Sequence, residues 1–415
     1  MRDEKRIALV TPWFGESGTG GSQILATQLA RELFAPAGGV DVLTTCCRSF
    51  EDDWSKNYYP EGTERTGNVT IRRFGVRRRN EAVFNCANEF LLSQPREWLK
   101  WNARSIPPGV AAAFCGENID SPGLLKYLAD WGRAYHAVIF TPYLYGPVLQ
   151  GVALLGERAY LQPCLHDEAY AYLPQVRSMF HSAKGLLFNS QAEYCLAQQL
   201  YGSEIASKSF VVGHWVDEPR GVTAKRRGAK PRGRFVLYLG RADPAKNVRP
   251  LVAAFADYRR YSAGSNLTLV LAGTGTDDIP AGDGVVSLGE IGDDLKRDLL
   301  QSCGALVQPS VSESFSRAVM EAWSYGKPVA VNGKCSATRA AVSQCGGGWI
   351  ASSTHDWIEV FATIARAPEA VLCSLGEFGR KYYVSNGTAA RVLERYRIAL
   401  DIDRPAGALP RAARS

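Results

Sequence analysis

Short apolar runs and longer amphipathic stretches alternate along this chain of 415 residues. Runs bounded by Gly, Pro, Asn or Asp are typical of buried strands, and the stretches between them are typical of helices. In the first half we expect strands at Ile7 to Val10, Val40 to Thr44, Val69 to Phe74, Ala137 to Phe140, Arg158 to Gln162 and Gly185 to Phe188. In the second half we expect them at Phe235 to Leu239, Leu267 to Ala272, Gly284 to Leu288, Ala305 to Gln308 and Val329 to Val331.

This alternation of strands and helices predicts an α/β protein with parallel sheets. The chain is too long for one ordinary core, so we expect two Rossmann-like domains of about 200 residues each. A basic stretch rich in Gly and Pro, Lys225 to Gly233, indicates an exposed linker between them. We place an N-terminal domain at 1–215, a C-terminal domain at 216–392, and a terminal helix or tail at 393–415 that crosses back to the first domain.

Composition fits an ordinary globular protein, with 46% hydrophobic and 21% charged residues. The charged start, Met1 to Arg6, leads into only a short apolar run, and no window reaches the 18 or so apolar residues of a membrane span. Ten cysteines without a C-x-x-C pair indicate reduced thiols. We therefore expect a cytoplasmic protein.

Two glutamates, Glu313 and Glu321, lie eight positions apart just after the strand that ends at Gln308. A helix is expected over Arg317 to Tyr325, because this stretch lacks Gly and Pro. Glu313 would then lie in a loop at the carboxyl end of a strand, and Glu321 one to two turns into the helix. Such a pair can hold two parts of a polyhydroxylated ligand, with the helix amides favouring an anion between them. A sugar nucleotide has these features, although a random pair of acids is more often solvated surface charge.

The run from 313 to 329 resembles the signature of the retaining family 4 glycosyltransferases, E-x-F-G-x4-E-A-x3-G-x-P-V. The matching residues are Glu313, Phe315, Glu321, Ala322, Gly326, Pro328 and Val329, while Ser316 stands where the family has glycine. The resemblance implies the glycosyltransferase B fold, with two Rossmann-like domains facing across a cleft. It also implies that Glu313 contacts donor-sugar hydroxyls, that Glu321 holds the ribose, and that Ser314, Phe315 and Ser316 belong to the donor loop.

Three further motifs follow strands of the second half. In Gly240 to Asn247, Arg241 and Lys246 can neutralise a diphosphate, although basic loop residues usually face solvent. The spacing resembles the family's donor-phosphate motif, G-R-x4-K. Gly273-Thr274-Gly275 resembles its G-x-G turn, and Gly289 and Ile291 lie where the family packs the nucleotide base.

The first half carries a Gly-rich loop after its first strand. Its spacing does not fit G-x-G-x-x-G, no acid ends the second strand, and the chain has no P-loop motif. A nicotinamide enzyme is therefore disfavoured. The resemblance instead places Gly20 and Gly21 against the donor phosphates.

A histidine, His166, follows the strand expected at Arg158 to Gln162. A histidine with only a structural hydrogen bond is the alternative to a functional one. The consecutive residues His166, Asp167 and Glu168 make a poor metal site, because adjacent side chains do not converge on one ion. The resemblance implies that His166 lines the cleft at the donor sugar.

These groups imply a transfer reaction in which Arg241, Lys246 and the helix amides stabilise a departing nucleoside diphosphate. The resemblance implies retention of anomeric configuration, with a phosphate oxygen of the leaving group taking the acceptor proton. We expect no metal and no cofactor, since the sugar nucleotide is a co-substrate. Asp401 and Asp403 imitate a D-x-D motif but are interpreted as surface.

The acceptor is less well defined. The chain carries an arginine cluster, Arg72, Arg73, Arg77, Arg78 and Arg79, and a mixed stretch, Trp98, Leu99, Lys100, Trp101 and Arg104. Such residues can contact an anionic membrane face or a lipid-linked acceptor at the inner membrane surface, or else form a solvated charge run and a core-covering helix. Nucleic acid is disfavoured, because no recognised reading module is present.

The overall hypothesis is a glycosyltransferase of glycan biosynthesis that uses a saccharide, lipid-linked or small-molecule acceptor. Two alternatives are a non-catalytic sugar-nucleotide-binding subunit that supports an active partner, and a synthase or phosphorylase acting on a soluble sugar.

Overall fold

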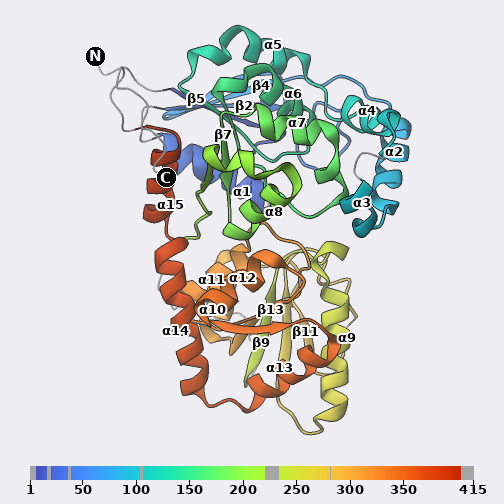
Figure 1. The fold of residues 1–415 in the computed structure, drawn as a ribbon. Helices are drawn as coiled ribbons and strands as arrows, with labels where there is room; N and C mark the ends of the chain where they lie inside the picture. Colours follow the sequence, from blue (N-terminus) through green and yellow to red (C-terminus); the bar gives the residue numbers. More distant parts are fainter. Residues whose placement is uncertain are drawn as a thin grey trace. The chain divides into compact units, whose positions relative to one another are not determined.

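The computed structural model describes residues 6–15, 20–35, 39–102, 106–219, 233–280 and 282–402. The chain divides into two compact units, each with its own sheet (Figure 1). Unit 1 contains Met1–Val212 together with Leu393–Ser415, and unit 2 contains Gly213–Val392. Among the described residues, no helix is both long enough and apolar enough to cross a membrane.

Unit 1 is built on a sheet whose neighbouring strands are parallel except at one edge, where β3 runs antiparallel to β4. In sheet order the described strands are β3 (Gly62–Thr66), β4 (Val69–Phe74), β2 (Val40–Thr45), β1 (Ile7–Thr11), β5 (Ala137–Phe140), β6 (Ala159–Leu161), β7 (Gly185–Phe188) and β8 (Ser209–Val211).

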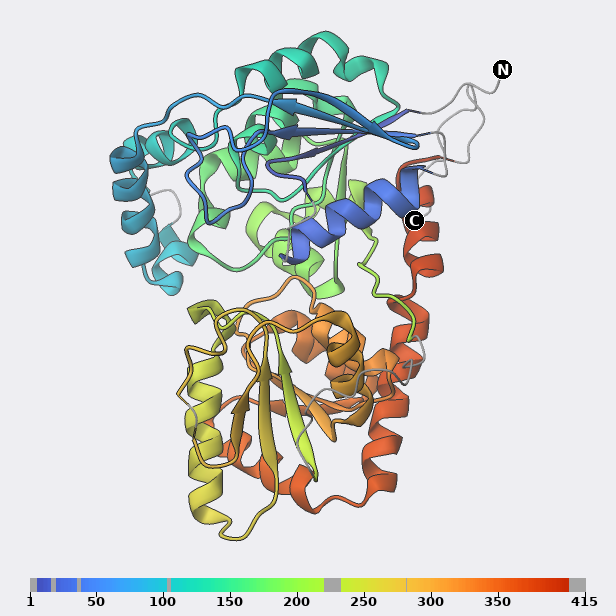
Figure 2. The same ribbon diagram turned by 180° about the vertical axis from the view of Figure 1, so that it is seen from behind.

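Helices cover this sheet, and many of them pack on a core that includes Val10, Phe140 and Leu161 (Figures 1 and 2). They are α1 (Gly21–Gln28) with a π-helical continuation at Leu29–Phe34, α2 (Glu81–Ser93), α3 (Arg96–Asn102), α4 (Pro108–Gly116), α5 (Pro122–Trp131), α6 (Gly146–Leu155), α7 (Pro174–Ser182), α8 (Gln191–Tyr201) and most of α15 (Ala389–Ala399). Short 3-10 turns lie at Gly132–Ala134, Gly156–Arg158, Ala169–Tyr172 and Ser203–Lys208.

Unit 2 is built on a fully parallel sheet. In sheet order its described strands are β11 (Val285–Ser287), β10 (Thr268–Ala272), β9 (Phe235–Leu239), β12 (Ala305–Gln308), β13 (Val329–Asn332) and β14 (Gly348–Ala351). Its helices are α9 (Val248–Tyr261), α10 (Asp293–Ser302), α11 (Arg317–Ser324), α12 (Ser336–Cys345), α13 (Thr354–Arg366) and α14 (Glu369–Asn386), and a 3-10 turn lies at Pro244–Lys246.

Alternate residues of the unit 2 strands point into two separate cores. Val236 and Tyr238 of β9 pack with α9 and α13, whereas Phe235, Leu237 and Leu239 pack with α10, α11 and α14. This alternation is what a strand with helices on both faces requires. Because helices cover both faces of the sheet, the polar loops emerge at the carboxyl ends of its strands.

The predicted fold class, α/β with two parallel-sheet domains, is confirmed. Every expected strand is present within two residues of its predicted ends, but β3, β8 and β14 were not expected. The sequence did not predict β3, because all its residues, Gly62–Thr66, are exposed and none of them is one of the large apolar residues typical of a buried strand. The linker predicted at Lys225 to Gly233 lies outside the described residues except for Gly233. Asp403 also lies outside them.

Candidate active site

The candidate site of unit 2 forms where the strand order of the sheet reverses direction. The first strand, β9, lies between β10 and β12, so the loops after β9 and β12 leave the sheet side by side. Open α/β sheets bind ligands at such a switch point, at the carboxyl ends of the strands. The loop after β9 carries Arg241 and Lys246, and the loop after β12 carries Glu313.

An ion pair joins these two loops. The ammonium group of Lys246 lies 2.8 Å from Glu313 Oε1, and the two side chains are only 24% and 11% exposed. Residues 67 positions apart in sequence are thus in direct contact. A pair so far removed from solvent is worth more than an exposed one, because its charges are less screened.

The loop that carries Arg241 is held by a short acidic turn. Asp243 accepts a hydrogen bond from the Lys246 amide at 3.2 Å, and its other oxygen lies 3.3 Å from the Arg241 guanidinium. Tyr238 donates its hydroxyl to the Arg241 carbonyl at 2.5 Å. Burial, with a smaller contribution from the Glu313 carboxylate, raises the pKa of Tyr238 far above its usual range, so the phenol stays a neutral donor.

Glycine is required where this loop meets the next one. Gly273 has φ +130°, and a Cβ there would lie 2.1 Å from the Gly240 carbonyl oxygen. Its amide donates to the Gly289 carbonyl at 2.7 Å, and Gly289 itself has φ +61°. The Gly273 loop therefore makes backbone contacts with both the Gly240 loop and the Gly289 loop. Ile291 follows Gly289, and its side chain packs on the adjacent core.

The second glutamate is held differently. Helix α11 places Glu321 in its second turn, where Oε1 lies 2.7 Å from the ammonium of Lys296 on α10 and 3.7 Å from the guanidinium of Arg317. Glu321 is 14% exposed. The sequence did not predict Lys296 as a site residue. It lies 25 positions from Glu321, and no local spacing indicates the contact.

Each glutamate thus has one carboxylate oxygen bound to a lysine. Within the described part of the chain, no hydrogen bond involves the other oxygen of Glu313 or Glu321. A carboxylate oxygen accepts hydrogen bonds and cannot donate them, so hydroxyl groups are its natural partners. The arrangement can therefore accept hydrogen bonds from two sets of ligand hydroxyls.

Ser316, which replaces the family's glycine, fits the loop without strain. Its backbone is extended, with φ −109° and ψ 107°, a conformation open to any residue. Its hydroxyl accepts a hydrogen bond from the Gln308 amide at 3.3 Å. It precedes α11 as the N-cap but makes no side-chain capping bond, so the first helix amides are not capped by it. Ser314 is buried, and Phe315 packs beside the ring of His214, 5.4 Å away.

The predicted residues of unit 1 lie at the carboxyl ends of its strands. Gly20 is the N-cap of α1, and its amide is bonded to Gln23 Oε1 at 3.3 Å. His166 is half-buried in the loop after β6. The preceding amide, that of Leu165, donates to the buried Glu193 carboxylate at 2.5 Å, which anchors the loop.

The two acids next to His166 are engaged with tyrosines. Tyr172 donates its hydroxyl to Asp167 at 2.8 Å, and Tyr143 donates to Glu168 at 2.6 Å. Across the residues that the structure describes, no three His, Cys, Asp or Glu side chains form a group suited to a metal ion.

The arginine cluster is mostly paired within unit 1. Arg72 and Arg73 lie inside β4, which matches the strand expected at Val69 to Phe74. Four of the five arginines form ion pairs with acids, namely Arg72 with Asp41, Arg73 with Glu64, Arg77 with Asp120 and Arg79 with Glu81. Leu99 is buried in the core and Trp98 packs against it, whereas the side chains of Trp101 and Arg104 are outside the described residues.

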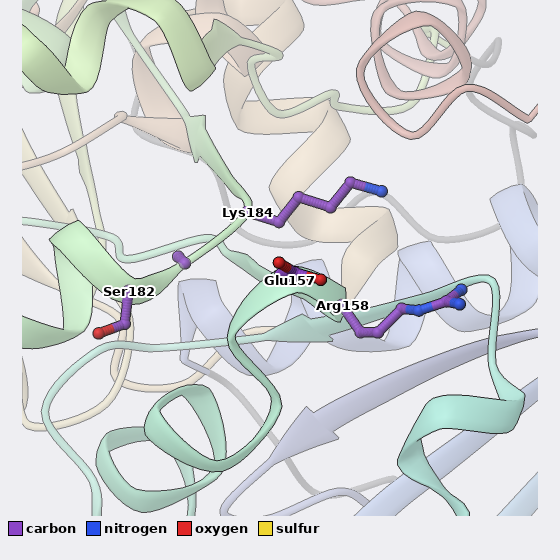
Figure 3. Close-up of a pocket in the computed structure, with 5 residues that line it drawn as sticks. Glu157, Arg158, Ser182 and Lys184 are labelled. Carbon is purple, nitrogen blue, oxygen red and sulfur yellow. The ribbon is translucent and has the colours of Figure 1, made fainter. Parts of the chain in front are cut away.

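An open pocket of about 610 Å³ lies elsewhere in unit 1 (Figure 3). Its lining includes Arg158 and Lys184, which immediately precede β6 and β7. The pocket is therefore at the amino ends of these strands, whereas His166 follows β6 at its carboxyl end. Ligand sites of open α/β sheets lie at the carboxyl ends, so this pocket is not the candidate site.

Comparison with known proteins supports the candidate site at the switch point of unit 2. Residues 233–367 match the family model described as "Glycosyl transferases group 1". This segment contains Arg241, Lys246, Glu313 and Glu321. A comparison with curated protein sequences gives no match.

Several solved structures share the fold over nearly the whole chain. Sucrose-phosphate synthase from Thermosynechococcus elongatus is 18% identical, with a TM-score of 0.66 and coverage of 94% of this chain and 97% of that one. An E. coli trehalose-6-phosphate structure bound with UDP-2-fluoro glucose is 11% identical, with a TM-score of 0.66 and coverage of 98% and 100%.

A Burkholderia xenovorans trehalose-phosphate synthase in complex with glucose-6-phosphate is 12% identical, with a TM-score of 0.68 and coverage of 95% and 100%. At these identities the likeness concerns the fold. The chain thus has the glycosyltransferase B fold, and its residues 233–367 are similar to the group 1 glycosyl transferases.

Proposed function

We propose that this protein is a retaining glycosyltransferase that moves a sugar from a nucleoside-diphosphate sugar to an acceptor hydroxyl. One observation carries the proposal: the switch point of unit 2 brings Lys246 onto Glu313, and Glu321, on the helix α11 that follows the Glu313 loop, has one oxygen that forms no hydrogen bond within the described residues. Cations for a diphosphate and carboxylates for hydroxyls are the groups that a sugar nucleotide requires.

In the proposed reaction the cationic groups act on the leaving group. The bond between the sugar's anomeric carbon and the diphosphate oxygen breaks, and Arg241 and Lys246 stabilise the charge that develops there. The acceptor oxygen forms its bond to the same face of that carbon, and its proton passes to the departing phosphate oxygen. Glu313 orients the donor sugar, and Glu321 holds the ribose diol.

The remaining roles rest on the family resemblance. Gly273, Gly289 and Ile291 would pack against the base, with Ser314, Phe315 and Ser316 forming the donor loop. His166 would assist at the donor sugar, and Gly20 and Gly21 at the phosphates. No divalent metal takes part in this scheme, because protein cations perform the neutralisation.

For the acceptor we propose a saccharide, lipid-linked or small-molecule hydroxyl in glycan biosynthesis. Two of the similar structures contain a UDP-sugar analogue and a sugar phosphate, which makes a soluble phosphorylated sugar a suitable first acceptor to test. Peripheral contact with the inner membrane face through 72–79 or 98–101 stays a weaker proposal, since most of these arginines are already paired.

The test begins with donor binding. UDP, GDP, ADP and their sugars are compared by thermal shift, since a ligand present at 100 times its Kd stabilises the folded protein by about 2.7 kcal/mol. The selected donor is then incubated with glucose-6-phosphate, with a lipid-linked acceptor, and alone. Transfer or donor hydrolysis supports an enzyme, and binding without turnover supports a non-catalytic subunit. If none of the nucleotides binds, the proposed function is wrong.

A further inference from the structure

A buried histidine, His214, contacts the first residue of α11, Arg317, and also Phe315 in the loop just before this helix. It lies just inside unit 2 and is 4% exposed. Its Nε2 is 2.9 Å from a guanidinium nitrogen of Arg317, the first residue of α11. Its ring packs 5.4 Å from the ring of Phe315, which lies in the donor loop. No spacing in the sequence points to this contact, because 103 positions separate His214 from Arg317.

The chemistry of the contact fixes the state of the histidine. A guanidinium has only donors, so His214 Nε2 must accept and the ring must be neutral. Burial, with a smaller contribution from the Arg317 charge, lowers the pKa of His214 well below its usual range, in agreement with this state.

Arg317 is in turn directed toward the second glutamate. The same nitrogen that meets His214 also donates to the Trp215 carbonyl at 3.0 Å. Its other terminal nitrogen lies 3.7 Å from Glu321 Oε1, the oxygen also bound by Lys296. Two acceptors from the segment 214–215 therefore hold the guanidinium while its far end faces the carboxylate. Arg317 therefore connects His214 to the Glu321 carboxylate.

We propose that His214 is a positioning residue for donor binding: through Arg317 it holds the Glu321 carboxylate in the orientation that receives the ribose hydroxyls. The inference rests on the proposed function, because it assigns a ribose to Glu321. His214 lies outside the run from 313 to 329 that carries the family resemblance.

The experiment compares two ligands that differ only in the ribose hydroxyls. The first is whichever of UDP, GDP and ADP binds the parent protein most tightly, and the second is its 2′,3′-dideoxy form. Dissociation constants are measured by calorimetry for the parent, His214→Ala and His214→Gln, with the exposed His355→Ala as the matched control. Melting temperatures are recorded for each variant.

Loss of a positioning hydrogen bond worth about 1.4 kcal/mol lowers affinity about tenfold. We expect this loss for His214→Ala with the ribonucleotide and no change with the dideoxy ligand. His214→Gln should recover most of the affinity, because its amide oxygen can accept from Arg317. His355→Ala should match the parent with both ligands.

An equal loss of affinity for both ligands, or no loss for either, would overturn the inference. Either result would show that His214 does not affect how the ribose hydroxyls are bound. If His214→Ala does not fold, Arg317→Met breaks the same link from the other side and is judged by the same two ligands. Failure of the parent to bind any nucleoside diphosphate is a different result, and it would remove the proposed function itself.

Discussion

Both units are built on sheets of mainly parallel strands, but their carboxylates lie in different environments. In unit 1, Asp41 is 4% exposed and is surrounded by Arg6 at 3.1 Å, Arg72 at 3.3 Å and the hydroxyl of Tyr135 at 2.5 Å. Glu193 is buried with both oxygens on backbone amides. In unit 2, Glu313 and Glu321 each keep one oxygen that forms no hydrogen bond within the described residues.

This difference separates structural acids from acids suited to a ligand. A carboxylate whose oxygens are both occupied stabilises the fold and has little capacity left for another partner. A carboxylate held by one cation is oriented but can still accept hydrogen bonds. The comparison predicts that mutation of the buried acids of unit 1, such as Asp41, changes stability, whereas mutation of the acids and cations at the switch point of unit 2 changes binding and turnover.

The largest effect is expected for the two cations after β9. Lys246→Ala or Arg241→Ala should raise the barrier by about 2–4 kcal/mol, the usual consequence of removing an electrostatic stabiliser of a leaving group. This corresponds to about 30- to 1,000-fold in kcat/KM from steady-state kinetics. The control is Lys126→Ala in unit 1, an exposed lysine in an ion pair with Asp130. Rates within threefold of the parent for both switch-point variants would exclude this loop from the site.

Asp41→Asn tests the structural side of the comparison. It removes the charge that pairs with Arg6 and Arg72, and we expect a loss of about 3 kcal/mol in the free energy of unfolding. Urea denaturation measures it, with the exposed Asp130→Asn as control. Nucleotide affinity of the folded variant should equal that of the parent. A variant that keeps its stability and loses affinity would reverse the assignment.

The two glutamates should separate binding from turnover. Glu321→Ala should weaken binding of the free nucleoside diphosphate by about 1–3 kcal/mol, because a ribose contact is lost. Glu313→Ala should leave that affinity largely intact and lower kcat with the intact sugar donor. Titration calorimetry and single-turnover kinetics measure the two quantities. Equal loss of diphosphate affinity in both variants would contradict the assigned roles.

A pH dependence follows from the buried histidine of unit 2. The pKa of His214 is lowered from 6.5 in the folded state, so below about pH 6.5 the unfolded chain binds a proton that the folded chain does not. Stability is therefore retained above this pH and falls as the pH decreases, with a slope of at most about 1.4 kcal/mol per pH unit.

Unfolding of the parent and of His214→Gln at pH 5 and pH 7.5 measures this dependence. The variant should lose less stability than the parent between the two conditions. An identical loss would show that His214 does not contribute, since the other histidines are unchanged in both proteins.

The smallest effect is expected from chelation. Activity should survive exhaustive EDTA treatment, because in the proposed reaction Arg241 and Lys246 perform the neutralisation that a cation would otherwise supply. Steady-state rates before and after treatment, and again with added magnesium or manganese, test this point. A loss of more than about tenfold that metal restores would assign at least about 1.4 kcal/mol of barrier lowering to an ion.

The apolar pattern was sufficient for most of the fold. Strands such as Phe235–Leu239 and Ala305–Gln308 have the same ends in the sequence prediction and in the structure, because they are buried on both faces and read as continuous apolar runs. The exposed β3 lacks that signal, whereas β8 and β14 are short strands that contain apolar residues but are only partly buried. Helix α1 is α-helical over Gly21–Gln28 and continues as a π-helix over Leu29–Phe34, a change in hydrogen bonding that periodicity does not reveal.

The sequence also placed Glu313 in a loop and Glu321 on a helix, since local turn and helix signals control both positions. It could not pair Lys246 with Glu313, add Lys296 and Arg317 to Glu321, or find His214. Those contacts join residues 25 to 103 positions apart, except for the pair Arg317 and Glu321 within one helix turn. Local patterns encode burial and chain direction, whereas the order of strands in the sheet decides which loops meet, and that order depends on the packing of the whole unit.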